Sequence, residues 1–266
     1  MVFRVILIIF ATFLIIRCSS NDNPVVADGD PGRLIVYLSD SPASYDSVVV
    51  RISRVEVHVS GTDTTSGSWF VINDSLRNFD LLELRNGASA VLGDTSLPPG
   101  NYTQIRLIVA DSSYVVDNDG PHLLTIPSGY QTGIKLNHSF NIESDNIYEL
   151  LLDFNVEKSI VTTGNGQHKL QPVIRVVPVV ISGSISGQVL PLEALPGSVS
   201  AIAGTDTVTT TYIDDEGYFK LVGLLEGLYD VSILPDTTVY KASTITNVQV
   251  MQNMDNDLGT ITLDPK

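Results

Sequence analysis

The chain has 266 residues, with 30 acidic side chains against 15 basic ones and a formal net charge of −15 at pH 7. This charge excludes a nucleic-acid-binding function, because such binding rests on neutralisation of phosphates by Lys and Arg. The single cysteine excludes an intramolecular disulfide, and the length accommodates two domains.

The N-terminus carries an apolar run of 12 residues, 5–16, between Arg4 and Arg17. A membrane-spanning helix needs about 20 residues, so this run is too short to cross a bilayer. A cation followed by a short apolar run is typical of a signal peptide, and Cys18 stands directly after it. The segment resembles the bacterial lipoprotein signal, although Arg17 replaces the usual small residue. We predict a signal peptide at residues 1–17 and lipid attachment at Cys18; the alternative is an ordinary or uncleaved signal.

Residues 18–32 are rich in Asp, Asn, Pro, Gly and Ser. Such a composition buries too little apolar surface to fold, so we predict a flexible tether that holds a folded body off a membrane. The acidic chain is expected to meet an anionic membrane surface only through its lipid. The expected localisation is therefore the cell envelope after export, at the outer membrane, with the leaflet left open.

Residues 33–181 alternate apolar and polar side chains in short runs separated by turn residues. This period of two is typical of half-buried β-strands. The clearest strand candidates are residues 34–38, 48–59, 102–109, 134–142 and 148–156. Residues 173–181 are nearly all apolar, which predicts a strand buried on both faces, and residues 79–84 are the best short helical candidate. Many short strands with turns between them predict a β-sandwich or barrel.

A second β-rich unit is predicted from residue 182 onward. The Ser- and Gly-rich residues 182–187 are interpreted as a boundary, and about seven short strand-like runs follow, which is the rhythm of a small antiparallel sandwich. The expected fold class is all-β, with two antiparallel β-sandwich-type domains in tandem, 33–181 and 182–266. Both contain the pattern Leu-x-x-Gly-x-Tyr before a strand, ending at Tyr102 and Tyr229. We predict that each tyrosine buries its ring and bonds its hydroxyl to the backbone, as in the tyrosine corner of sandwiches.

Several motifs of the first unit occur together in one known family. They are LSDSPA at residues 38–43, ISRVEVH at 52–58, Trp69, DLLEL at 80–84, LPPGNY at 97–102, LLDF at 151–154 and QPVIRV at 171–176. With these motifs, residues 31–180 resemble the bacterial lipoprotein family catalogued as domain of unknown function 4382. The resemblance implies an exported, β-rich body that is usually tethered to a membrane, and it implies no activity.

The second unit has its own motifs: ISGQV at residues 185–189, DEGYF at 215–219, GLLEGLYDV at 223–231 and DLGTI at 257–261. With them, residues 182–264 resemble the carboxypeptidase regulatory-like, prealbumin-like β-sandwich, which has a carbohydrate-binding-like fold. The resemblance implies an accessory module without catalytic residues.

No catalytic constellation is recognisable. The four histidines, 58, 122, 138 and 168, show neither an H-E-x-x-H motif nor an i, i+4 pair, and no Gly-x-Ser-x-Gly elbow occurs. We therefore predict a non-enzyme without a cofactor, in which each histidine is structural and His58 lies on the outer face of a strand. Asp153 is expected to be an exposed or strand-pairing carboxylate. Trp69 is expected to be a core ring, with an exposed sugar-binding platform as the alternative.

Acidic turns recur along the chain, at residues 28–30, 117–120, 214–217 and 255–257. Oxygen clusters on turns bind Ca²⁺, although Asp and Asn also favour turns for their own conformational reasons. None of these turns completes an EF-hand loop. Asp117 and Asp119 are the candidate metal ligands, and no other ligand-binding residue is identifiable from the sequence.

Three functions follow from these observations, in order of preference. The first is a non-catalytic, lipid-anchored cell-envelope protein acting in interaction, scaffolding or adhesion, with another envelope protein as its partner. The second is a carbohydrate-binding surface module with a glycan as partner, which rests on fold-level analogy. The third is a hydrolase whose catalytic residues are dispersed along the chain, since the members of a Ser-His-Asp triad lie far apart in sequence.

Overall fold

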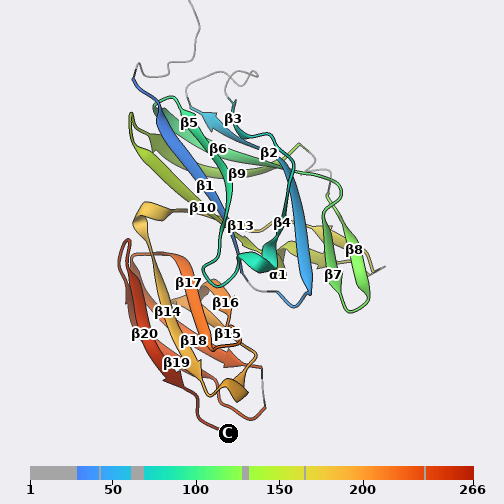
Figure 1. Cartoon of the computed structure of the whole chain (residues 1–266), viewed down its shortest axis with the longest axis vertical. Coiled ribbons are helices and arrows are strands. Elements are labelled where there is room, and N and C mark those ends of the chain that lie inside the picture. Colours follow the sequence, from blue (N-terminus) through green and yellow to red (C-terminus); the bar gives the residue numbers. More distant parts are fainter. Residues whose placement is uncertain (1–28, 42, 61–68, 128–131, 165, 237) are drawn as a thin grey trace, which may run out of the picture.

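The computed structural model describes residues 29–41, 43–60, 69–127, 132–164, 166–236 and 238–266. These residues form strands with a few single helical turns, which confirms the expected all-β fold class. Two β bodies lie end to end, the first coloured blue to yellow and the second orange to red (Figure 1). Cys18 and most of the predicted tether lie outside the described residues, so the lipid anchor stays a prediction.

Two sheets face each other in the first domain. One has the order β13 (Ile174–Pro178), β10 (Ile147–Asn155), β1 (Gly32–Ser41) and β5 (Ala90–Leu97). The main path of the other is β11 (Ile160–Thr162), β12 (His168–Leu170), β8 (Gly120–Thr125), β7 (Tyr114–Asp117), β2 (Ser47–Val59), β6 (Gly100–Val109) and β9 (Ile134–Ile142). The short strands β3 (Trp69–Asn73) and β4 (Arg77–Asp80) also pair with β2.

Alternation decides which side chains form the first core. In β1, Leu34, Val36 and Leu38 are fully buried, and β1 pairs with β10, whose buried side chains include Leu152 and Phe154. Because successive side chains point to opposite faces, the other side of β1 presents Tyr37 and Ser39 away from this core. That outer face is the one on which the second domain packs.

The second domain is a sandwich of two smaller sheets. One has the order β17 (Tyr218–Leu225), β14 (Ser182–Leu190) and β20 (Asp255–Thr262). The other has the order β16 (Asp206–Tyr212), β15 (Gly197–Ala203), β18 (Gly227–Pro235) and β19 (Ser243–Val250). Its hydrophobic cluster is separate from that of the first domain. Each domain contains a mixed sheet, because β1 pairs in parallel with β10 and β14 pairs in parallel with β20.

The two Leu-x-x-Gly-x-Tyr patterns form the same structure, as predicted. The hydroxyl of Tyr102 donates to the carbonyl of Pro98 at 2.9 Å, and that of Tyr229 donates to the carbonyl of Leu225 at 2.9 Å. Both rings are buried, and burial raises the pKa of Tyr102 to about 12.

Two local expectations need correction. Residues 173–181 do not form a strand buried on both faces: β13 is an edge strand, and a 3-10 turn, Val179–Ile181, follows with Val180 exposed. Residues 79–84 divide into the end of β4 and one 3-10 turn, Leu81–Leu84, too short for an α-helix. Residues 182–187, interpreted as a boundary from the sequence, form the first part of β14, the first strand of the second sandwich, and Gly183 allows the backbone at Met251 to approach closely.

Candidate functional site

One contact between the two domains is made by an arginine of the first domain that is also held in an ion pair there. Arg175 on β13 donates through Nη2 to the Asp153 carboxylate at 2.7 Å and through Nη1 to the carbonyl of Gly223 in the second domain at 2.6 Å. Asp153 points away from the first core, as its position in β10 predicts. It is not exposed, however: only 6% of the residue is accessible. The other expected role, a strand-pairing carboxylate, is the one that the structure shows: Asp153 lies opposite Arg175 on the neighbouring strand and pairs with the cation that reaches the second domain.

A second join comes from the loop after the 3-10 turn. The side-chain amide of Asn86 accepts from the backbone N–H of Lys220 and donates to the carbonyl of Tyr218 at 3.4 Å. Its backbone N–H donates to Thr211 at 3.1 Å. The amide therefore covers backbone groups of β17, the edge strand of its sheet, as a neighbouring strand would. Two independent contacts thus fix how the domains meet.

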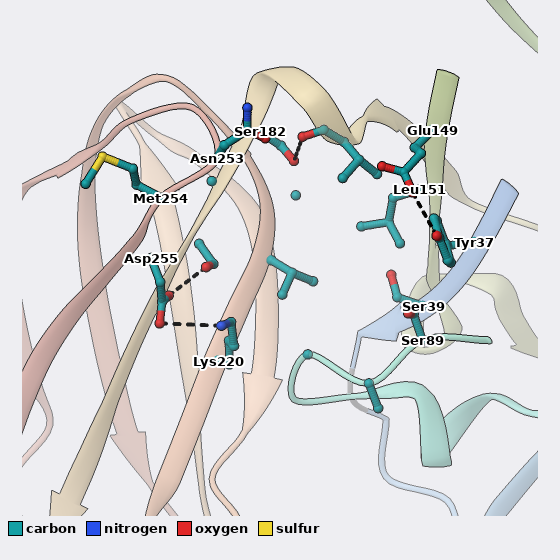
Figure 2. Close-up of a pocket in the computed structure, with 17 residues that line it drawn as sticks. Tyr37, Ser39, Ser89, Glu149, Leu151, Ser182, Lys220, Asn253, Met254 and Asp255 are labelled. Atoms are coloured by element: carbon teal, nitrogen blue, oxygen red, sulfur yellow. Dashed lines mark hydrogen bonds and ion pairs between the residues drawn. The ribbon is translucent and has the colours of Figure 1, made fainter. Parts of the chain in front are cut away.

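An interdomain pocket lies beside these joins, with a volume of about 470 Å³. The residues that its chemistry depends on are Tyr37, Ser39, Glu149, Leu151, Lys220 and Asp255. Figure 2 shows the side chains of the first domain facing those of the second across the pocket. Ligand pockets typically hold 300–1,000 Å³ and favour domain interfaces, so size and place both fit a binding site.

The wall from the first domain offers hydrogen-bonding groups. The Tyr37 hydroxyl donates to Glu149 Oε1 at 2.8 Å. This hydrogen bond is the main cause that raises the pKa of Tyr37, and burial is the second. Ser39 is 2% exposed, and its Oγ has no hydrogen-bond partner among the described residues. Ser39 is one of the residues that line the pocket. A buried hydroxyl without a partner is costly to keep, and a ligand would satisfy it.

The wall from the second domain is charged. Lys220 Nζ lies 3.4 Å from Asp255 Oδ2, and the hydroxyls of Ser184 and Ser186 donate to the same carboxylate at 2.6 and 2.8 Å. Partial burial works to raise the pKa of Asp255, but these hydroxyls and Lys220 outweigh it, so the pKa lies below its usual range. The carboxylate is therefore a charged, fixed acceptor at neutral pH.

Of the two predicted metal ligands, Asp117 and Asp119, only Asp117 lies in a group of described side chains that could hold a metal ion. The carboxylate of Asp117 lies beside His122 and His168, with its Oδ1 2.9 Å from His122 Nε2. Asp119 approaches Asp117 through its backbone N–H, at 2.9 Å. Both histidines were predicted to be structural and separate, so their grouping around Asp117 was missed.

Trp69 is half-buried and lies outside the first core, contrary to the expectation of a core ring. It pairs across β2 and β3 with His58, which lies on the outer face as predicted, and the two rings are 5.0 Å apart. The Arg106 guanidinium stands 4.0 Å from the centre of the indole ring. This cation already occupies one face of the ring, which leaves less of it for a sugar to stack on.

Comparisons with known proteins give one family. Residues 31–172 match the family described as "Domain of unknown function (DUF4382)". No curated protein matches the chain. Within the described residues, no helix is long and apolar enough to span a membrane.

The structural likenesses are remote. A type II cohesin–X-dockerin complex from Acetivibrio cellulolyticus is 23% identical over 30% of this chain and 56% of that one, with a TM-score of 0.25. The Bacillus anthracis TIE protein is 10% identical over 89% of this chain and 34% of that one, with a TM-score of 0.25. The shaft pilin spaA from Lactobacillus rhamnosus GG is 8% identical over 89% of this chain and 98% of that one, with a TM-score of 0.28. The chain thus spans about half of the cohesin–dockerin chain, and none of these scores carries an argument about function.

Proposed function

Because the chain belongs to the DUF4382 family, which is defined without a function, we propose its role from its own surfaces: a non-catalytic binding protein of the bacterial cell envelope. Its ligand is a small neutral or amino sugar, bound in the interdomain pocket. The observation that carries this proposal is the buried hydroxyl of Ser39, which has no hydrogen-bond partner among the described residues and belongs to a residue that lines that pocket.

The envelope location rests on the sequence of the N-terminus. A short apolar run before Cys18 and a polar segment after it support lipidation of that cysteine. Replacing Cys18 by alanine is expected to move the protein from the membrane fraction to the soluble fraction. If the C18A protein stays with the membranes, the anchor is wrong, whatever the pocket binds.

The charge of the pocket selects the class of ligand. Its charged lining residues are Glu149, Asp255 and Lys220, so its carboxylates outnumber its single cation. This balance disfavours phosphate and other anions, which proteins bind with clustered cations. Carboxylates and hydroxyls are instead the acceptors and donors that sugar hydroxyls or an ammonium group require.

The shape of the pocket agrees with a sugar ring. Leu151 and Val222 supply apolar surface, and Tyr37 supplies one aromatic ring. Small-molecule sites combine such apolar lining with a few fixed polar groups. Because Arg175 and Asn86 hold the domains together, these groups are in place before the ligand arrives.

The role of the second domain as a regulatory-like accessory module remains a prediction. In this proposal it supplies Lys220 and Asp255 to the pocket wall and has no chemistry of its own. Neither domain alone would hold the ligand, because the first supplies Ser39 and Glu149.

A glycan array probed with the purified full chain identifies the sugar, and calorimetry then measures its affinity. Ser39→Ala removes one hydrogen bond and is expected to weaken binding about 2- to 10-fold. Glu149→Gln removes a charged acceptor and is expected to weaken it about 10- to 150-fold. Glu143→Gln, which changes an exposed carboxylate outside the pocket, is the matched control and leaves binding unchanged.

Stability separates a binding role of Ser39 from a structural one. Since its hydroxyl is buried without a partner, Ser39→Ala is expected to leave the free energy of unfolding unchanged or to raise it by about 1 kcal/mol. An array without a sugar hit, or a hit whose affinity neither pocket variant changes, would overturn the proposed ligand site.

A further inference from the structure

A second site lies in the first domain, outside the interdomain pocket, where three side chains with metal-ligating atoms meet. They are Asp117 on β7, His122 on β8 and His168 on β12, and one ligand atom of each lies within 4.8 Å of the others. His122 Nε2 is 2.9 Å from Asp117 Oδ1, and His168 Nε2 is 3.8 Å from Asp117 Oδ2. Unlike the predicted acidic turns, this group contains two imidazoles.

The register of the strands places all three side chains on one face of the sheet. In the β7–β8 hairpin Val115 pairs with His122, so Asp117, two residues after Val115, lies on the same face as His122. β12 then joins β8 in parallel, with His168 beside Leu124. Leu124 is two residues after His122, so His168 also lies on that face.

Neighbouring groups orient the candidate ligands. Thr162 Oγ1 lies 3.2 Å from His168 Nδ1 and can accept a hydrogen bond from an N–H at that position. In this tautomer His168 Nε2 carries the lone pair, and it faces Asp117. Metal-bound histidines usually have such a partner on the second ring nitrogen. The Asp119 backbone N–H holds Asp117 Oδ1 at 2.9 Å. Burial works to raise the pKa of Asp117, but this bond and the two imidazoles outweigh it, so the pKa is lowered.

We propose that Asp117, His122 and His168 bind one divalent transition-metal ion, for which Zn²⁺ is the reference. Two imidazole nitrogens suit such an ion and do not suit Ca²⁺, which prefers oxygen ligands. A tetrahedral zinc with bonds of about 2.0–2.1 Å separates its ligand atoms by roughly 3.4 Å. The separations of 2.9 and 3.8 Å, measured to the two different oxygens of Asp117, lie on either side of that value, and one ligand atom of each residue lies within 4.8 Å of the others, so side-chain rotations would bring the three atoms to tetrahedral spacing.

The three side chains differ in solvent exposure, and this difference shows from which side a fourth metal ligand can approach. The side chain of His168 is 8% exposed, whereas those of Asp117 and His122 are 26% and 33% exposed. The metal therefore has protein on the β12 side and solvent on the other. A site with three protein ligands leaves its fourth position for water or for a group of another molecule.

Calorimetric titration of the metal-free full chain with Zn²⁺ tests this site. We expect one Zn²⁺ per chain and no heat from Ca²⁺ at the same concentration. His122→Ala is expected to weaken Zn²⁺ binding at least tenfold. Because the side chain of His122 is 33% exposed, the variant should keep the fold, which circular dichroism checks. Thr162→Val, which alters only the orienting hydroxyl, is expected to weaken binding about tenfold.

His58→Ala is the matched control, because His58 lies against Trp69 and takes no part in the cluster. Zn²⁺ binding by this variant should equal that of the parent. The proposal is overturned if the parent binds no Zn²⁺, or if His122→Ala binds it as tightly as the parent does.

Discussion

Replacing Arg175 by alanine leaves the buried carboxylate of Asp153 without its cation. The side chain of Asp153 is 7% exposed and that of Arg175 is 29% exposed, so the acid loses its partner in a poorly hydrated place. Breaking a buried ion pair from one side costs about 3–5 kcal/mol. Because Arg175 is partly solvated, we expect a loss of free energy of unfolding near the lower limit, about 3 kcal/mol.

The double variant, Asp153→Leu with Arg175→Leu, removes both charges. Replacing a buried pair by apolar side chains is often nearly neutral. The carbonyl of Gly223 still loses its donor, which costs about 1 kcal/mol. The double variant is therefore expected to be more stable than Arg175→Ala, by about 2 kcal/mol.

Urea unfolding followed by tryptophan fluorescence measures these differences, because Trp69 is the single tryptophan and lies in the first domain. Two results would contradict a buried, coupled ion pair at this position. One is a loss below about 1 kcal/mol for Arg175→Ala, which is the range of an exposed pair. The other is a double variant no more stable than the single one.

Two further predictions concern the second join and the tyrosine corner. Asn86→Ala removes the side chain that covers the β17 edge and is expected to lower the free energy of unfolding by about 1–2 kcal/mol. Asn141→Ala, at an exposed position, is the control and should change the free energy of unfolding little. Equal losses in the two variants would contradict the role of Asn86. Tyr102 has a pKa raised from 10.0 to about 12, so its contribution to stability is complete below pH 10 and is lost as the pH rises toward 12, by about 2–3 kcal/mol. Alkaline unfolding curves of Tyr102→Phe should lack this part of the loss, and curves parallel to those of the parent would exclude it.

The sequence predicted the fold where one face of a strand is buried. Alternating residues such as Leu150, Leu152 and Phe154 identify β10 because burial on one face imposes a period of two. The prediction failed at residues 173–181, where the side chains do not alternate. An apolar run there suggests burial, but it does not show where the strand ends or which residues are covered by other elements. There, Val177 is buried while Val180 is exposed.

The sites were less predictable because they depend on contacts between distant residues. Ser39 lies in a motif that the family resemblance singled out, yet only the packing of the second domain brings Lys220 and Asp255 opposite it. Asp117 and His122 belong to one hairpin, so their spacing is a local signal that register could have revealed. His168 joins them through the parallel pairing of β12 with β8, which no local pattern specifies.

A crystal structure of the full chain with the tightest-binding ligand from the glycan array shows whether the interdomain pocket binds a sugar. We expect ligand density between the two domains, with a sugar hydroxyl within hydrogen-bond distance of Ser39 Oγ and another near Glu149 or Asp255. Density against Trp69 on the outer sheet face, with the interdomain pocket filled only by water, would contradict it.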